Sequence, residues 1–293
     1  MYHDLLEFLP EQADQTVSFR VTNNVITSQV AGMVVGAMYP SDQPFPLQIQ
    51  PASIDSLEPK YSCDFADALS ADYSTGSDNA NWTLHLNSSE ALYTALDAIS
   101  NVPVDDDGWH RSWDHYFDNL SARQCHSKPL PCNISNPNLC ITQDQANTVY
   151  RLGQYEYSYI YRGAPQSLSY ATASYGIWAA ELAQNLRDVM SGSSTMRYRH
   201  NVAHDGSISR LLSLLQLDIM VWPGMGAEVV FELWKSPEGR NLLRVLWGGQ
   251  VLRSSNPNFG LMDMIDVDLF LGYVDALAGR GAEKVPQVCA ESS

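Results

Sequence analysis

Two residues that could handle protons and anions stand next to each other at positions 204 and 205. His204 and Asp205 follow a strand-like run, "TMRYRHNVA" (195–203), and precede a run (206–216) with the i, i+3, i+4, i+7 apolar spacing of a buried helix face. A strand that ends at a helix N-terminus is where α/β proteins bind ligands, because the free N–H groups favour an anion. There His204 could donate a hydrogen bond to a phosphate oxygen, and a carboxylic acid at Asp205 could protonate a leaving alkoxide.

Asp205 also has a purely structural interpretation, in which it caps the helix. Aspartate is a preferred N-cap residue, and Gly206 and Ser207 would open the first turn. The residue types alone leave both interpretations open. The sequence therefore predicts an N-cap at Asp205, at the position where an acid would also be placed.

A second group of ligand-type side chains lies in "DDDGWHRSWDHYFD" (105–118), which holds five aspartates with His110 and His115. Its spacing fits no metal loop, so an acidic surface loop that leads into an amphipathic helix is the better interpretation. His200 and His204 are four apart on one strand face and could also be taken as ligands. The phosphate interpretation is preferred there, and we predict neither a metal nor a cofactor.

Strands and helices alternate at both ends of the chain. The expected elements are a strand at 16–21, a helix at 26–38, a strand at 45–51, a long helix at 167–191, a strand at 195–203, a helix at 206–216, strands at 226–234 and 241–252, and a helix at 264–278. Strand, helix, strand at this spacing is typical of a parallel α/β sheet. The last two strands are expected to pair as a hairpin around "KSPEGR".

Residues 52–140 differ in composition from the rest. They are rich in Ser, Asp, Asn and aromatic residues, and they favour short helices near 89–99 and 111–124. We therefore predict an α/β domain formed by 1–51 and 141–293, with 52–140 as a helical cap insertion.

The same insertion carries the marks of an exported glycoprotein. Four N-x-S/T sequons begin at Asn81, Asn87, Asn119 and Asn133. The five cysteines are Cys63, Cys125, Cys132, Cys140 and Cys289. They lack C-x-x-C spacing, so in an oxidising compartment we expect two disulfides and one leftover thiol. We expect a secreted protein or one in the vacuolar or lysosomal lumen. The start "MYHDLLEFLPEQADQ" has no signal-peptide pattern, which suggests that the true N-terminus is missing.

The charge balance excludes some partners. Lys and Arg number 17 against 33 Asp and Glu, which gives a formal net charge of −16. Nucleic acids and anionic membranes need a positive surface, so neither is expected as a partner. No apolar stretch approaches the roughly 18–20 residues that span a bilayer. A small anionic substrate stays open, because a few local positive groups can hold it.

Several segments match known motifs in order and at similar spacing. They are "AHD" at 203–205, "WP" at 222–223, "FEL" at 231–233, "RVLWGGQ" at 244–250 and, upstream, "FRVTNNVITSQVAGMVVGAMYP" at 19–40. Together they resemble the histidine acid phosphatases, the branch of the histidine phosphatase superfamily that includes phytases and lysosomal acid phosphatases. The upstream segment is similar to the family's R-x-T-x-x-x-R-T run.

The resemblance implies a fold and a reaction. The fold is a three-layer α/β/α sheet domain, phosphoglycerate mutase-like, with a helical cap. The reaction is phosphomonoester hydrolysis through a phosphohistidine, with a phosphorylated small molecule as substrate. The resemblance makes His204 a phosphate-binding residue, Asp205 the general acid and Arg20 a weak substrate-binding candidate. Glu232 in "FEL" would organise the floor of the site, or be an ordinary half-buried strand carboxylate.

Two departures from the family set up an alternative. None of the seven histidines lies in R-H-G-x-R-x-P, so the nucleophile and the first strand are expected to lie upstream, and the chain as given should be inactive. Neighbouring strand edges would then be unpaired. Ile26 stands at the position of a phosphate-binding arginine and lacks its guanidinium fork. The alternative is a catalytically inactive phosphatase-fold glycoprotein that binds an anionic ligand or partner.

Overall fold

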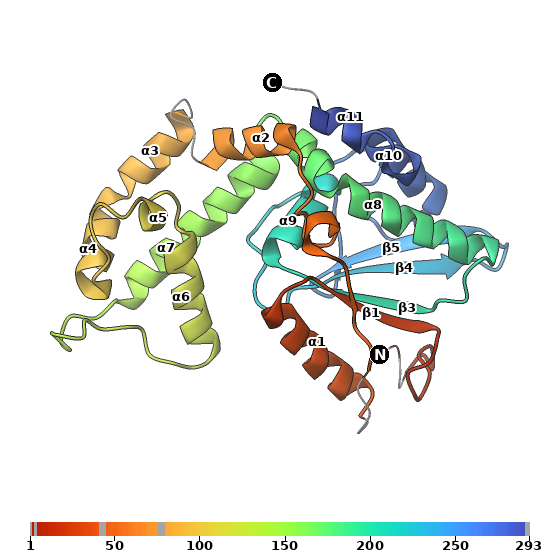
Figure 1. Cartoon of the computed structure of the whole chain (residues 1–293), viewed down its shortest axis with the longest axis horizontal. Coiled ribbons are helices and arrows are strands. Elements are labelled where there is room, and N and C mark those ends of the chain that lie inside the picture. The colour runs from red at the N-terminus through yellow and green to blue at the C-terminus, as the bar shows by residue number, and fades with distance from the viewer. Residues whose placement is uncertain (1, 3–4, 41–44, 75–79, 291–293) are drawn as a thin grey trace. The chain divides into compact units, whose positions relative to one another are not determined.

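The computed structural model groups the chain into two compact units (Figure 1). The residues that it describes are 2, 5–40, 45–74 and 80–290. Unit 1 comprises Met1–Ala66, Leu168–Asp218 and Pro223–Ser293, and unit 2 comprises Asp67–Ser167 and Ile219–Trp222. Unit 2 is thus inserted into the sequence of unit 1. The limits predicted for the helical cap insertion, residues 52 and 140, stay a prediction.

Unit 1 contains a three-stranded parallel sheet in the order β2-β1-β3. Its strands are β1 (Val17–Val21), β2 (Gln48–Ile49) and β3 (Tyr198–Val202). The β-branched and aromatic residues of β1 suit a strand, and Val17, Phe19 and Val21 are buried. Val21 lies opposite Val202 in the pairing register, so β1 and β3 end at the same edge of the sheet. The residues that follow these two strands are therefore brought together.

A four-stranded antiparallel sheet holds the C-terminal strands of unit 1. They are β4 (Val229–Lys235), β5 (Asn241–Trp247), β6 (Gln250–Val251) and β7 (Ile265–Asp266). The predicted hairpin around "KSPEGR" is confirmed, because β4 pairs with β5 along its whole length. The predicted strand 241–252 is wrong as a single strand. It breaks at Gly248 and Gly249, whose φ angles of 55° and 74° turn the chain from β5 into β6.

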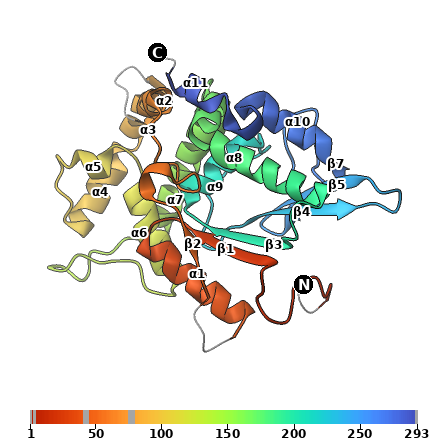
Figure 2. The same cartoon turned by 45° about the vertical axis from the view of Figure 1, so that its right-hand side comes forward.

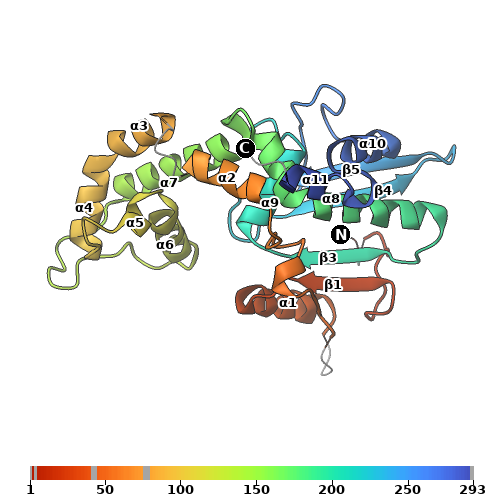
Figure 3. The same cartoon turned by 45° about the horizontal axis from the view of Figure 1, so that its top comes forward.

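The single sheet expected from the sequence is divided between β3 and β4. Among the residues that the structure describes, β3 pairs only with β1, and β4 pairs only with β5. Figure 2 and Figure 3 show the two groups of strands, with β3 beside β1 and β4 beside β5. An open edge presents unpaired N–H and C=O groups.

Among the described residues, five α-helices belong to unit 1 together with its strands. They are α1 (Val25–Met38), α8 (Ser167–Ser191), α9 (Asp205–Leu214), α10 (Val267–Ala278) and α11 (Val285–Ala290), with the short 3-10 turns η1 (Ala52–Ile54) and η3 (Arg280–Ala282). α1 packs against β1 and β3, and α10 packs against β5. Figure 1 and Figure 2 show α1 and α8 on opposite sides of β1 and β3. The predicted α/β fold class is confirmed.

Unit 2 is built of helices around an aromatic core. It contains most of α2 (Asp64–Ser74), then α3 (Ala80–Ser88), α4 (Glu90–Ser100), α5 (Asp107–His110), α6 (Asp114–Cys125), α7 (Gln143–Ser158) and the π-helical turn η2 (Tyr159–Gly163). Tyr93 and Trp113 stack in this core with ring centroids 3.8 Å apart. Within the described part of the chain, no helix combines the length and the apolar character needed to span a bilayer.

Two disulfides are formed, and one thiol is left over, as predicted. In unit 1 Cys63 bonds to Cys289, 226 positions further along the chain. In unit 2 Cys132 bonds to Cys140, 8 positions away, and Cys125 is an exposed free cysteine. The pattern fits a protein that folds in an oxidising compartment.

Candidate active site

His204 and Asp205 lie where β3 passes into α9. His204 is the N-cap residue of α9, with extended φ and ψ angles of −108° and 164°, and Asp205 is the first helical residue. The predicted cap at Asp205 is therefore wrong by one position, because the helix already begins there. The Asp205 carboxylate accepts a hydrogen bond from the Gly206 N–H at 2.7 Å. A carboxylate and an imidazole thus stand together at the positive end of a helix.

A pair of buried threonines positions the His204 ring. The ring nitrogen Nε2 lies 3.1 Å from Thr22 Oγ1, directly after β1. Thr22 Oγ1 is 2.8 Å from Thr27 Oγ1, and the Thr27 hydroxyl donates to the carbonyl of Asn24 at 2.9 Å. Both threonines are buried, so this chain of hydroxyls is part of the core of unit 1. We did not predict a role for either threonine, although both stand in the R-x-T and R-T positions of the upstream motif.

A carboxylate also approaches His204. Glu58 Oε2 lies 3.6 Å from His204 Nε2, and Lys60 Nζ lies 3.1 Å from the other oxygen of Glu58. The Lys60 side chain is 56% exposed, whereas the Glu58 side chain is 22% exposed. No feature of the sequence pointed to Glu58, because the contact joins positions far apart in the chain.

Arg20 is held by acidic partners beside the sheet. Its NH1 donates to Glu181 Oε2 at 2.8 Å, and its NH2 donates to Asp55 Oδ1 at 2.9 Å. NH2 also donates to the side-chain oxygens of Gln50 and Ser56, at 2.5 Å and 3.0 Å. Two carboxylates therefore surround one guanidinium group. The structure shows Arg20 as the centre of an ion-pair network, and its assignment to substrate binding stays a prediction.

Ile26, at the position of the family's second arginine, lies in the first turn of α1. Its side chain is 66% exposed, and its N–H donates to the side chain of the N-cap residue Asn24 at 2.9 Å. The neighbouring Thr27 is buried and belongs to the hydroxyl chain that reaches His204. The backbone of the motif is thus in place, while the side chain at position 26 carries no charge or hydrogen-bonding group.

Glu232 forms a cross-strand ion pair. It lies opposite Arg244 in the register of β4 and β5, and Arg244 Nε donates to its Oε2 at 2.5 Å. Trp234 Nε1 and the hydroxyl of Tyr2 also donate to this carboxylate. Burial raises the pKa of Glu232, but the hydrogen bonds from Arg244, Tyr2 and Trp234 outweigh it and hold the pKa below its ordinary value. The interpretation as a strand carboxylate accounts for these contacts.

The other ligand-type side chains are used locally. His200 lies 2.7 Å from the Tyr198 hydroxyl through Nδ1, and burial lowers its pKa. In unit 2 Asp106 caps α5, and His110 Nε2 lies 3.0 Å from Asp97 Oδ2. Over the described ranges no three or more His, Cys, Asp or Glu side chains gather as metal ligands.

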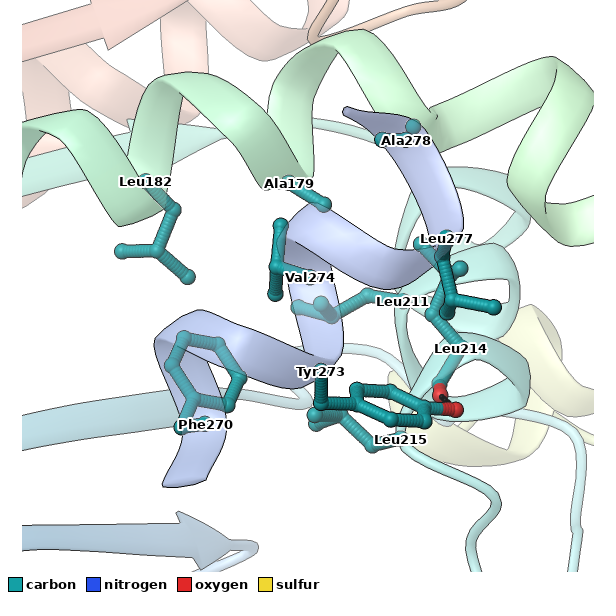
Figure 4. Close-up of a pocket in the computed structure, with 11 residues that line it drawn as sticks. Ala179, Leu182, Leu211, Leu214, Leu215, Phe270, Tyr273, Val274, Leu277 and Ala278 are labelled. Atoms are coloured by element: carbon teal, nitrogen blue, oxygen red, sulfur yellow. Dashed lines mark hydrogen bonds between the residues drawn. The ribbon is translucent and has the colours of Figure 1, made fainter. Parts of the chain in front are cut away.

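An enclosed gap in unit 1 is apolar and unsuited to phosphate. Figure 4 shows its lining side chains, which project from α8, α9 and α10. They are aliphatic or aromatic, such as Leu182, Leu211, Phe270 and Val274. The hydroxyl of Tyr273 donates to the carbonyl of Leu214 at 2.7 Å. The gap is part of the hydrophobic core, and the candidate site is the edge where β1 and β3 end.

The four sequons differ in exposure. Asn81, Asn87 and Asn119 are exposed and stand on α3 and α6, although sequons are commonly found in loops. Asn133 is 9% exposed, and its Nδ2 donates to the carbonyl of Ala98 at 2.8 Å. Its Oδ1 accepts from the Ser135 and Asn136 N–H groups. The fold therefore presents three of the four predicted acceptor side chains and encloses the fourth.

Comparison with known proteins defines the class of fold. A phytase from Citrobacter braakii superposes with a TM-score of 0.63 at 11% identity, over 97% of this chain and 83% of the phytase. A phytase from Klebsiella sp. ASR1 gives a TM-score of 0.60 at 16% identity, over 100% of this chain and 82% of the phytase. The chain thus has the fold of the histidine acid phosphatases, and the resemblance seen in the sequence is confirmed at that level.

Sequence comparison adds two curated relatives. Counting factor 60 from Dictyostelium discoideum is 28% identical over 146 residues, which are 49% of this chain and 30% of that protein. 2-phosphoxylose phosphatase 1 from Danio rerio is 28% identical over 158 residues, 46% of this chain and 31% of that protein. The matched part of the chain thus spans about a third of the length of either relative. No family model matches the chain.

Proposed function

We propose that the protein hydrolyses phosphomonoesters as a histidine acid phosphatase. The observation that carries the proposal is the placement of His204 and Asp205 at the end of β3, where Thr22 fixes the imidazole and α9 begins. The phytase-like fold supports it, and so does the similarity to a protein named as a phosphatase. The proposed substrate is a phosphorylated small molecule.

In the proposed reaction a histidine nitrogen attacks phosphorus while the bond to the leaving oxygen breaks. Asp205 gives its proton to the departing alkoxide. His204 donates a hydrogen bond to a non-bridging oxygen and so stabilises the charge on the phosphoryl group. Water then attacks the phosphohistidine, and the ionised Asp205 takes the proton of that water. The attacking histidine of the proposed reaction is not one of the seven in these 293 residues, because none of them lies in an R-H-G-x-R-x-P motif.

The proposed location is outside the cell or in a vacuolar or lysosomal lumen. The disulfides Cys63–Cys289 and Cys132–Cys140 support an oxidising compartment. The exposed sequon residues Asn81, Asn87 and Asn119 support N-glycosylation. The net charge of −16 disfavours nucleic acid as a partner.

Two observations favour a second function, that of an inactive phosphatase-fold glycoprotein which binds an anionic ligand or partner. Ile26 offers no guanidinium group where the family has an arginine. The charge of Arg20 is already balanced by Asp55 and Glu181. Neither arginine position would then be available to bind phosphate, and His204 would bind an anion without hydrolysing it.

The test compares Asp205→Asn with Asp268→Asn in the full-length protein. Asp268 is the matched control because it also lies in the first turn of a helix, α10, and is exposed. Near pH 5 we expect Asp205→Asn to slow hydrolysis of a sugar phosphate by about 10²–10⁴-fold, the usual contribution of a general acid. Its effect on p-nitrophenyl phosphate should be smaller, because nitrophenolate leaves without a proton. Unchanged hydrolysis of the sugar phosphate would overturn the role of Asp205, and a wild type that binds phosphate without hydrolysis would favour the second function.

A further inference from the structure

The ring nitrogen that would bind phosphate already faces a carboxylate. Glu58 Oε2 lies 3.6 Å from His204 Nε2, and the same nitrogen lies 3.1 Å from Thr22 Oγ1. One N–H can serve only one strong acceptor at a time. We propose that Glu58 competes with phosphate for His204 and so sets the anion affinity of the site. This inference rests on the function proposed above.

Glu58 is placed by a fixed stretch of chain. Leu57, directly before it, is 1% exposed, and its carbonyl accepts from the Ser207 hydroxyl at 2.8 Å. The Leu57 N–H donates to Asp55 Oδ1 at 2.9 Å, and this same oxygen accepts from Arg20. The backbone directly before Glu58 is therefore anchored to α9 and, through Asp55 and Arg20, to β1. With Leu57 held in this way, rotation of the Glu58 side chain is the simplest route by which its carboxylate can leave His204.

The charges around His204 disfavour a second anion. Glu58 and Asp205 both carry carboxylates, and the ammonium group that balances Glu58 belongs to Lys60, whose side chain is 56% exposed. A solvated charge is screened more strongly than the half-buried Glu58 carboxylate. The guanidinium of Arg20 is engaged by two carboxylates of its own. Phosphate must therefore displace Glu58 or bind against its charge.

The experiment measures binding of inorganic phosphate to the full-length protein by isothermal titration calorimetry. Glu58→Gln keeps the size of the side chain and removes its charge, so we expect a Kd about tenfold lower than that of the wild type, the scale of one unit charge at this distance. Glu238→Gln is the matched control, because it removes the same net charge from the exposed turn between β4 and β5. Its Kd should stay within about twofold of the wild type, since distant exposed charges are screened.

Two further variants connect the effect to His204. Adding His204→Ala to Glu58→Gln should abolish the gain in affinity. Lys60→Met keeps the Glu58 carboxylate and removes its ion-pair partner, so phosphate should bind about two- to threefold more weakly. The Lys60→Met measurement can therefore still refute the inference if Glu58→Gln fails to fold, a failure that circular dichroism would reveal.

The outcomes separate this inference from the proposed function. If His204→Ala abolishes phosphate binding in the wild type but Glu58→Gln brings no gain, the competition is refuted and the phosphate site stands. If neither the wild type nor Glu58→Gln binds phosphate, both are overturned. A gain in Glu58→Gln that survives His204→Ala, or an equal gain in Glu238→Gln, would refute direct competition at His204.

Discussion

Replacing Arg20 with glutamine should destabilise unit 1 by about 3–4 kcal/mol, chiefly because it strands a buried carboxylate. Asp55 has a side chain that is 1% exposed, and its Oδ1 lies 2.9 Å from Arg20 NH2. Its other oxygen, Oδ2, is buried without a hydrogen-bond partner among the described residues. Without the guanidinium group, this carboxylate keeps the hydrogen bond from the Leu57 N–H, at 2.9 Å, and loses its cationic partner.

The size of the effect follows from burial at the two ion pairs. Removing one partner of a buried pair costs about 3–5 kcal/mol, which sets the scale for Arg20 with Asp55. The pair with Glu181 adds little, because the Glu181 side chain is 37% exposed and exposed pairs contribute at most about 1 kcal/mol. Glutamine at position 20 can still donate to a neighbouring oxygen, which keeps the total in the lower half of the range. At about 2–4 °C per kcal/mol, the thermal midpoint should fall by roughly 10 °C.

The assay is thermal and urea unfolding followed by circular dichroism, with Arg187→Gln as the matched control. Arg187 NH2 lies 2.7 Å from Asp275 Oδ2, but the Asp275 side chain is 34% exposed, so this change should cost about 1 kcal/mol or less. A double-mutant cycle with Asp55→Asn should give a coupling energy above about 1.5 kcal/mol.

A cost for Arg20→Gln no larger than that for Arg187→Gln would refute the reasoning from burial. A normal midpoint with greatly weakened phosphate binding would show instead that Arg20 serves the ligand, as the family resemblance suggested. Either result would also remove the argument that Arg20 is unavailable to phosphate.

The two disulfides should differ in what they contribute to stability. The chain-entropy relation gives about 5 kcal/mol for Cys63–Cys289, which are 226 positions apart, and about 2.5 kcal/mol for Cys132–Cys140, which are 8 apart. In urea unfolding, replacing both cysteines of the first pair with alanine should therefore cost more stability than replacing both of the second. The reverse order would contradict the relation. Glycopeptide mass spectrometry of the native protein should find glycans at the exposed Asn81, Asn87 and Asn119 and an unmodified Asn133, whose Nδ2 is buried and hydrogen-bonded. A glycan at Asn133 would show that the loop before α7 folds differently.

The architecture could be predicted because it depends on local patterns. Apolar spacing located α9, and the turn residues of "KSPEGR" located the hairpin of β4 and β5. The break at Gly248 and Gly249 was missed, because two glycines within an apolar run do not show whether their φ angles are positive. The cap of α9 was placed one residue late for a related reason. His204 has no side-chain cap bond, so residue preference pointed to the aspartate beside it.

The candidate site could be predicted only in part. His204 and Asp205 are adjacent in sequence and could be recognised together, but their neighbours are not. Thr22 lies 182 positions from His204, and Arg20 lies 161 positions from Glu181. Contacts of that separation depend on the order of strands in the sheet and on side-chain rotamers, which residue spacing does not determine. For this reason the approach of Glu58 to His204 was seen only in the structure.

The Cys63–Cys289 bond also has a topological consequence. It closes a covalent ring of the chain that contains His204, Asp205, both strands of the hairpin and all of unit 2. A single cleavage by a protease anywhere between the two cysteines opens this ring without dividing the molecule. If the cut falls between positions 63 and 204, Thr22 and His204 lie on different pieces, and the disulfide keeps these pieces covalently joined until it is reduced.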